Sequence, residues 1–178
     1  MKRILSALAG VVLALPALPA RSVDAVGLTV GSGPDADMVS AHLIWDWDKK
    51  WLTQGQWELT GYWQLDLSAW KGSGEPPERK LNAIGITPIF RYQKKSLDGS
   101  GFFLEAGIGV YEFSGTELHG DKRIGTAFEF GDHLGFGFRF GPQGRHDFGY
   151  RFQHYSNGGI SRDNTGVNFH QIRLKIGI

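Results

Sequence analysis

Polar and apolar residues alternate along most of the chain after residue 25, and this pattern predicts extended strands. Around residues 57–68, one face would carry the apolar set Trp57, Leu59, Trp63, Leu65 and Leu67. The opposite face would carry the polar set Glu58, Thr60, Gln64, Asp66 and Ser68. Successive side chains of a β-strand point to opposite sides, so a period of two residues indicates a strand with one apolar face.

Eight segments share this alternation. They lie near residues 26–33, 37–48, 55–70, 80–95, 100–114, 123–140, 145–157 and 166–178. Clusters of Pro and Gly at residues 31–34, 72–77 and 141–144 separate several of them, as turn-forming residues do. No segment keeps a 3.6-residue period for more than two turns, so no crossover helices are expected. Long connections are expected only at residues 71–80 and 157–166.

Two kinds of closed barrel fit eight such strands, and residue size separates them. The apolar rows carry Phe, Leu, Ile and Trp, whereas the opposite rows mix Gly with charged and amide residues. The interior of an eight-stranded barrel is narrow and suits the second set better. The segments are also long enough to cross a bilayer, which takes about 9–11 residues. The pattern therefore favours an all-β fold, an eight-stranded antiparallel transmembrane β-barrel, over a secreted lipocalin-like barrel.

Charged residues on the expected inward rows predict a structural network of ion pairs inside the barrel. These residues are Glu58, Asp66, Arg91, Glu105, Arg139, Arg151 and Arg173. The composition agrees with a barrel, since Gly makes up 26 of the 178 residues and aromatic residues make up 13%. The absence of Cys excludes a disulfide framework. With 19 basic and 18 acidic residues, the chain lacks the basic excess of a nucleic-acid-binding protein.

The first 25 residues have the features of a secretory signal peptide. Lys2 and Arg3 precede an apolar stretch that is too short to span a membrane as a helix. Val23 and Ala25 fit the small-x-small cleavage rule, which predicts a signal peptide over residues 1–25 and a barrel over residues 26–178. Cleavage after Ala20 is the alternative. An exported barrel of this kind is expected in the outer membrane of a Gram-negative cell.

Four polar residues break the outward apolar rows of the last two segments. Counting by twos places His154 and Ser156 outward on the seventh segment, and Asn168 and His170 outward on the eighth. Polar groups that face hydrocarbon are unfavourable unless they are paired or lie at the interface. The same residues fit an interfacial loop rich in turn formers, so the pattern alone leaves a structural role open.

The chemical alternative is a serine hydrolase. His154 could accept the proton of Ser156, because residues two apart on a strand share a face. A third group must orient the imidazole, and Asn168 is the candidate matched by the same count. The amide of Gly158 or Gly159, or the side chain of Asn164, could stabilise an oxyanion.

Several sequence segments resemble the PagL-type lipid A 3-O-deacylases. They are HYSNGG at residues 154–159, WDWDKKW at 45–51, LTGYW at 59–63, FLEAGIGV at 103–110 and FSGT at 113–116. They occur in the same order over essentially the whole mature chain. The resemblance implies an outer-membrane barrel that hydrolyses the ester of the 3-hydroxyacyl chain at position 3 of lipid A.

Carried over to this chain, the resemblance makes Ser156 the nucleophile, His154 the general base and Asn164 an oxyanion-hole residue. One position departs, since the type member of the family has Glu where this chain has Asn168. Asn can fix the imidazole tautomer but cannot stabilise imidazolium by charge. Asp163 is the nearby carboxylate that could act instead.

Two functional hypotheses remain at this stage. The first is an esterase whose partners are lipid A and the lipids of the outer membrane, with no cofactor and no metal because serine–histidine chemistry is self-contained. The second is a non-enzymatic barrel that serves adhesion or membrane integrity. Short connections between most strands favour the first. The sequence leaves open whether two copies form a homodimer.

Overall fold

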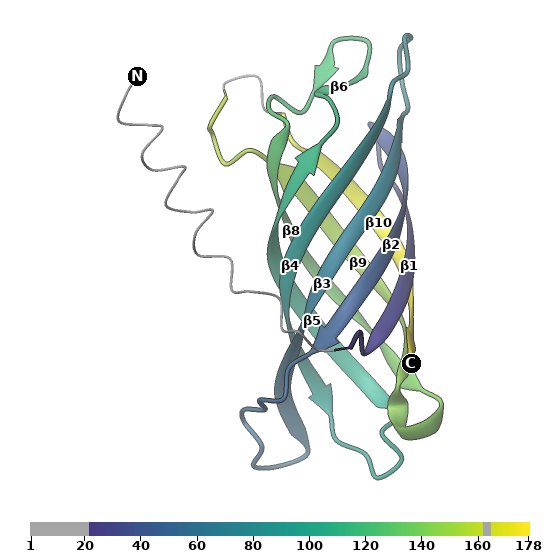
Figure 1. Ribbon diagram of the computed structural model, residues 1–178, viewed down its shortest axis with the longest axis vertical. Helices are drawn as coiled ribbons and strands as arrows, with labels where there is room; N and C mark the ends of the chain where they lie inside the picture. Colours follow the sequence, from purple (N-terminus) through teal and green to yellow (C-terminus); the bar gives the residue numbers. More distant parts are fainter. Residues whose placement is uncertain (1–21, 162–164) are drawn as a thin grey trace.

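The computed structural model describes residues 22–161 and 165–178, which form one closed barrel of eight antiparallel strands (Figure 1). Its strands are β1 (Ala25–Ser32), β2 (Ala36–Asp46), β3 (Trp57–Gly72), β4 (Lys80–Lys94), β5 (Gly101–Phe113), β8 (Phe128–Phe140), β9 (His146–Ser156) and β10 (Val167–Gly177). They pair in the order β1-β10-β9-β8-β5-β4-β3-β2. The all-β prediction is confirmed. Most of the expected signal peptide, and both Asp163 and Asn164, lie outside the described residues.

The two ends of the barrel differ in their connections. The end at which Ala25 pairs with Gly177, here called the terminal end, carries the loops at residues 47–56, 95–100 and 141–145. The last of these contains a single 3₁₀ turn, η1 (Pro142–Gly144). The opposite or distal end carries the connections at residues 33–35, 73–79, 114–127 and 157–166. No helix in the described residues is long and apolar enough to cross a membrane.

The connection at residues 114–127 corrects the prediction of long connections at only two places. It contains a small hairpin of β6 (Glu117–His119) and β7 (Lys122–Arg123) at the distal end (Figure 1). The predicted sixth strand therefore begins at Phe128 rather than near residue 123. The hairpin folds back because its Leu118 and Ile124 are buried in the apolar cluster of the distal lumen.

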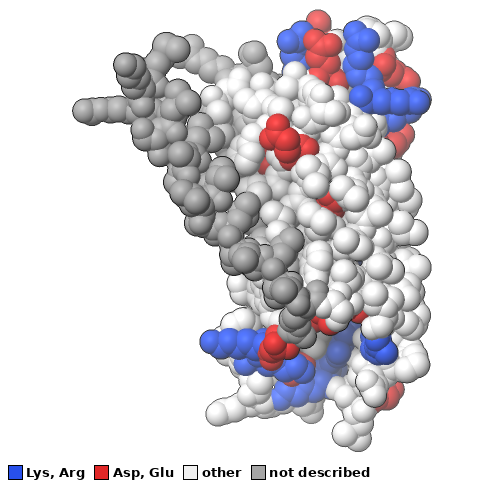
Figure 2. All heavy atoms as spheres, viewed as in Figure 1, with Lys and Arg blue, Asp and Glu red and all other residues white. Residues whose placement is uncertain are grey.

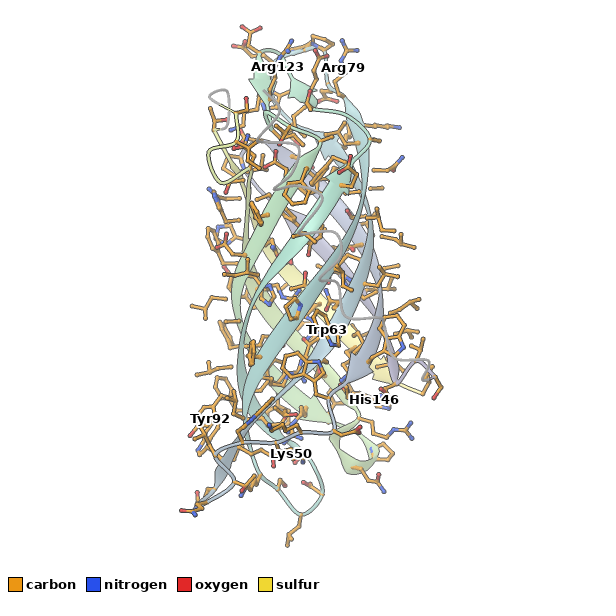
Figure 3. The ribbon with its side chains drawn as sticks, turned by 60° about the vertical axis from the view of Figure 1, so that its left-hand side comes forward. Lys50, Trp63, Arg79, Tyr92, Arg123 and His146 are labelled. Carbon is orange, nitrogen blue, oxygen red and sulfur yellow. The ribbon has the colours of Figure 1, made fainter. Side chains whose placement is uncertain are left out.

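The strands present the apolar face outward, as the alternation predicts. Exposed residues of the outer wall include Leu28, Leu67, Ile108, Leu134, Phe138 and Leu174. On the face shown in Figure 2, Lys and Arg gather at the two ends, and the band between them carries few charged side chains. Figure 3 shows Arg79 and Arg123 at the distal end and Lys50 and His146 at the terminal end. This distribution matches a wall that crosses hydrocarbon between two wet interfaces.

The terminal half of the lumen holds the predicted ion-pair network. Glu105 accepts hydrogen bonds from Arg91 and Arg151, each at 2.8 Å. Asp147 accepts bonds from Arg91 and Arg173, also at 2.8 Å. All five side chains are almost wholly buried. Asp147, which the sequence analysis did not single out, is therefore a central member of the network.

The remaining predicted lumen charges make their contacts outside this network. Asp66 pairs with His42 at 2.5 Å rather than with an arginine. Glu58 pairs with Lys50 of the 47–56 loop at 3.0 Å. Arg139 is only partly buried and donates to the backbone carbonyl of Lys94. These three charges therefore belong to local contacts, and the shared network is built from the arginines around Glu105 and Asp147.

The distal half of the lumen contains a packed apolar cluster, which alternation alone does not predict. Trp70 packs edge-on against Phe113, Tyr155 and Phe169, with ring centroids 4.6–4.8 Å apart. Leu118 of the β6–β7 hairpin lies in the same buried cluster. An inward tryptophan fits here because small and apolar neighbours leave room at this end. Packed aromatic rings on the lumen side therefore support the strands that carry His154 and Asn168.

Contacts of the barrel begin before the expected cleavage position. Ala25 is buried as the first residue of β1 and pairs with Ile44 and Gly177. The backbone N–H of Asp24 donates to the Ile44 carbonyl at 2.9 Å, and the Asp24 carbonyl accepts from the Ile178 N–H at 3.0 Å. Asp24 and Ala25 therefore contribute to closing the terminal end.

Candidate active site

The candidate site lies on the outer wall near the distal ends of β9 and β10. The antiparallel register pairs His154 with Asn168 directly. Their chain neighbours Tyr155 and Phe169 point inward and are buried in the aromatic cluster. Alternation therefore anchors both strands through their inner residues and leaves the polar pair facing outward.

Within the described residues, one hydrogen bond holds the imidazole of His154. Its Nδ1 lies 2.7 Å from Oδ1 of Asn168. When Nδ1–H donates to the amide oxygen, the lone pair is on Nε2, which is the arrangement that a general base requires. At the next outward position of β10, toward the terminal end, His170 Nδ1 lies 2.6 Å from the Tyr150 hydroxyl. Three of the four outward polar residues thus have side-chain partners on this surface.

Gly166 makes room for the His154 ring. A Cβ atom at Gly166 would lie only 2.6 Å from Cε1 of His154, and the backbone here has a φ of 65°. A side chain would therefore displace the imidazole and also strain the backbone. The glycine before β10 is thus part of how the sequence sets the ring orientation.

Ser156 is the last residue of β9 and is partly exposed on the same outer face. It lies two residues beyond His154 and pairs with Phe130 of β8. Among the described residues, no hydrogen bond joins its Oγ to the imidazole. Catalytic hydrogen bonds are often long in a substrate-free enzyme and shorten in the complex. The missing bond therefore does not rule out Ser156 as the nucleophile.

The turn after Ser156 holds two of the candidate oxyanion donors. The N–H of Gly159 donates to Oδ1 of Asn157 at 3.0 Å, and Gly158 and Gly159 both have positive φ. The Gly159 amide is therefore already engaged by this local turn. Asn164, the other candidate, lies outside the described residues, as does Asp163.

Sequence reasoning missed one residue of this surface. Asp132 of β8 lies opposite His154 on the side away from Asn168 and is exposed on the outer wall. The count by twos that places Leu134 and Phe136 outward would have found Asp132, had it been extended one step back along the strand. Within the described residues, its carboxylate has no hydrogen bond or ion pair.

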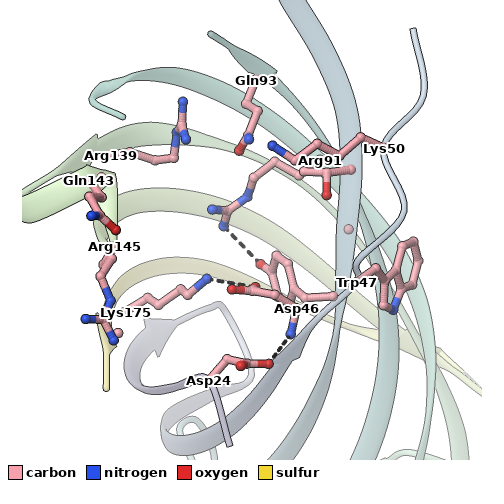
Figure 4. Close-up of a pocket in the computed structure, with 15 residues that line it drawn as sticks. Asp24, Asp46, Trp47, Lys50, Arg91, Gln93, Arg139, Gln143, Arg145 and Lys175 are labelled. Atoms are coloured by element: carbon pink, nitrogen blue, oxygen red, sulfur yellow. Dashed lines mark hydrogen bonds and ion pairs between the residues drawn. The ribbon is translucent and has the colours of Figure 1, made fainter. Parts of the chain in front are cut away.

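A polar cavity of about 230 Å³ lies at the terminal end, far from His154 (Figure 4). Its lining includes Asp46, Arg91, Arg139 and Lys175. The Lys175 amine contacts Asp46 at 3.1 Å, and Arg91 belongs to the lumen network. The cavity is therefore the mouth of the charged lumen. In the described ranges, no group of three or more His, Asp or Glu residues is arranged to hold a metal ion.

Comparison with known proteins connects this geometry to a family. The family model "Lipid A 3-O-deacylase (PagL)" matches residues 38–176. The chain is 37% identical over 154 residues to the lipid A deacylase PagL of Pseudomonas aeruginosa, covering 86% of this chain and 84% of that protein. It is 39% identical over 118 residues to the lipid A deacylase PagL of Bordetella bronchiseptica, covering 66% of this chain and 61% of that protein.

A solved structure agrees. The crystal structure of the outer membrane enzyme PagL superposes with a TM-score of 0.76 and 33% sequence identity, covering 86% of this chain and 99% of that one. The residues that the family model matches include His154, Ser156 and Asn168. This chain belongs to the PagL family of lipid A 3-O-deacylases.

Proposed function

We propose that this chain is an outer-membrane esterase that removes the 3-O-linked acyl chain of lipid A by serine–histidine catalysis. The observation that carries the proposal is the His154–Asn168 hydrogen bond on the outer wall, two residues from Ser156, in a chain of this family. Nucleophile, base and orienting group thus occupy one surface that faces lipid. A site on the outer wall suits a substrate whose acyl chains lie in the bilayer.

The proposed reaction begins when Ser156 Oγ attacks the carbonyl carbon of the ester and His154 Nε2 takes the hydroxyl proton. The Asn164 side chain, together with the Gly159 N–H once it has left Asn157 Oδ1, stabilises the oxyanion of the tetrahedral intermediate. The intermediate collapses, and the sugar oxygen leaves with the proton from the imidazolium. Water, deprotonated by His154, then hydrolyses the acyl–Ser156 ester and releases the fatty acid. Asn168 keeps the imidazole tautomer fixed throughout.

The barrel geometry supports an orientation in the membrane. Outer-membrane barrels generally have short periplasmic turns and longer extracellular loops. The longest connection, residues 114–127, and the 157–166 connection both lie at the distal end. The distal end therefore faces outside, and Ser156 lies at the level of the outer leaflet, which carries lipid A. The terminal end, with its charged mouth, faces the periplasm.

The contacts of Asp24 and Ala25 distinguish between the two candidate cleavage positions of the signal peptide. A cut after Ala25 would remove the first residue of β1 and both Asp24 backbone bonds. A cut after Ala20 would keep them. We therefore favour cleavage after Ala20, and the N-terminal sequence of the mature protein tests this choice.

The activity is tested by the mass spectrum of lipid A from Gram-negative cells with and without the expressed protein. The proposal predicts a new lipid A species that lacks one 3-hydroxyacyl chain. Cells that express Ser156→Ala at the same level in the outer membrane should lack this species. An unchanged lipid A spectrum with folded wild-type protein would contradict the proposal and favour the non-enzymatic barrel.

A further inference from the structure

We propose that Asp132 provides the negative charge which stabilises the His154 imidazolium, a role that Asn168 cannot fill. This inference rests on the proposed function, because it concerns how the same serine–histidine pair is supported. It assigns to β8 a supporting carboxylate that acts through His154 and does not touch the substrate.

The register brackets His154 between two polar neighbours. Asp132 of β8 lies opposite it on one side, and Asn168 of β10 lies opposite it on the other. Directly opposed residues in an antiparallel sheet have Cβ atoms about 4.5–5.5 Å apart. All three side chains point outward, since their strand neighbours on either side are buried. The carboxylate therefore lies within one strand spacing of the ring.

Asp132 lies where a negative charge is unfavourable without a positively charged partner. It interrupts the outward row formed by Phe130, Leu134 and Phe136 on β8. A carboxylate on the lipid-facing wall is destabilising unless it lies near the interface or meets a positive charge. Within the described residues it meets none in the resting protein. The imidazolium that forms during catalysis is the cation that this position would meet.

The chemistry explains why such a charge matters here. A neutral amide oxygen accepts a hydrogen bond from Nδ1–H but adds little stabilisation when the ring becomes positive. A carboxylate about one strand spacing away interacts with the ring over a short distance in a medium of low dielectric constant. The interaction exists mainly in the transition state, because the resting ring is neutral. It therefore lowers the barrier rather than tightening substrate binding.

Other titratable groups surround His154 but do not replace Asp132. His170 on β10 shares the outer face and is occupied by the Tyr150 hydroxyl. Glu129 of β8 interacts electrostatically with His154, but it is buried on the lumen side and bonded to Thr126. Among the described residues next to His154, Asp132 is thus the carboxylate on the reacting face.

The test is the pH dependence of lipid A deacylation by the purified full-length protein in detergent. For Asp132→Asn we expect kcat to fall about tenfold, with KM nearly unchanged. The acid limb of the kcat/KM profile should move about one unit to lower pH, because imidazolium loses its stabilising charge. Asp132→Glu should restore most of the activity and the position of the limb. Adding Asn168→Glu to Asp132→Asn should do the same from the other strand.

Two controls separate this inference from the proposed function. Glu112→Gln removes another exposed outer-wall carboxylate, on β5 at the same end, and should leave kcat and the pH profile unchanged. Heat modifiability on gels shows that each variant is folded. Wild-type rate and pH profile in folded Asp132→Asn, with Ser156→Ala inactive, would overturn the role of Asp132 alone. So would a raised KM with unchanged kcat, which would make Asp132 a substrate contact. An active Ser156→Ala would instead overturn the proposed function.

Discussion

The lumen network around Glu105 and Asp147 and the outer-wall surface around His154 differ in how completely their groups are paired. In the lumen, every oxygen of Glu105 and Asp147 accepts at least one bond from a buried side chain. On the outer wall, His154 has one amide partner, and Asp132 has none among the described residues. The first cluster has the properties of a structural network, and the second has those of a reactive site.

The difference follows from the environment of each cluster. Charges inside the narrow lumen are stable only when opposite charges and hydrogen bonds replace the water that they lose. The outer site lies near the interface, and its groups must be free to change protonation and to meet a substrate. Groups held as tightly as the lumen carboxylates, whose oxygens all accept bonds, could do neither. We therefore expect substitutions in the two clusters to affect different quantities: stability for the lumen, turnover for the wall.

The largest effect is expected for Ser156→Ala and for His154→Ala. Each should reduce deacylation by on the order of 10⁴-fold or more, because nucleophile and base act as one unit. The free energy of unfolding should stay close to that of wild type. Activity in detergent and denaturant unfolding in lipid vesicles measure the two quantities. Near wild-type turnover in either variant would show that the outer-wall cluster is not the catalytic site.

Glu105→Gln should lower the free energy of unfolding and leave kcat unchanged. It removes the negative charge that Arg91 and Arg151 share. Arg91 keeps its pair with Asp147, whereas the buried Arg151 guanidinium loses its carboxylate partner. Loss of one member of a buried pair typically destabilises by about 3–5 kcal/mol. Denaturant unfolding in lipid vesicles measures this loss, while the molecules that remain folded should retain their kcat. Wild-type stability would mean that the lumen network is not what holds the terminal half together.

Substitutions of Asn168 should change turnover less than those of Ser156 and His154, and they test how the His154 ring is oriented. Asn168→Ala should slow turnover about 10- to 100-fold, the value of one hydrogen bond to a group that becomes charged. Asn168→Glu should keep or raise activity, because a carboxylate also stabilises the imidazolium. Asp163→Ala is the matched control and should remain active. If Asp163→Ala were inactive and Asn168→Ala fully active, Asp163 would be the orienting residue.

The smallest effect is expected for Lys50→Gln. Lys50 is half exposed and pairs with Glu58 at the mouth of the barrel. Pairs of this kind typically contribute about 0–1 kcal/mol and are screened by salt. Unfolding measurements at low and high ionic strength should therefore show a small, salt-dependent change and no change in kcat. A loss as large as that of Glu105→Gln would show that the Lys50–Glu58 pair contributes as much to stability as the lumen network.

The sequence predicted those parts of the fold that follow from alternation. The eight barrel strands, the outward apolar rows and the facing of His154 and Asn168 all depend on a period of two, which survives folding unchanged. The β6–β7 hairpin could not be predicted in this way, because it is held by burial of Leu118 against distant residues such as Trp70. The count by twos does place Trp70 on the inward row of its strand, but it gives no sign that distant strands bring other aromatic rings against it.

The site was predicted less completely than the fold. Parity identified His154, Ser156 and Asn168 as one surface, but it could not show which residue of β8 lies beside them. That neighbour depends on the register between β8 and β9, which brings Asp132 opposite His154. Register is set by pairing along the whole strand and by the turn that joins the two strands, so alternation alone does not fix it.

The most direct test of the central claim is covalent labelling of the purified protein with a long-chain alkyl phosphonate ester, followed by mass spectrometry of its peptides. Such an ester mimics the acyl substrate and traps an activated serine. The account predicts one adduct, on Ser156, which forms far more slowly in His154→Ala and is unaffected by Lys50→Gln. An adduct on another residue, or no adduct in a preparation that still deacylates lipid A, would contradict it.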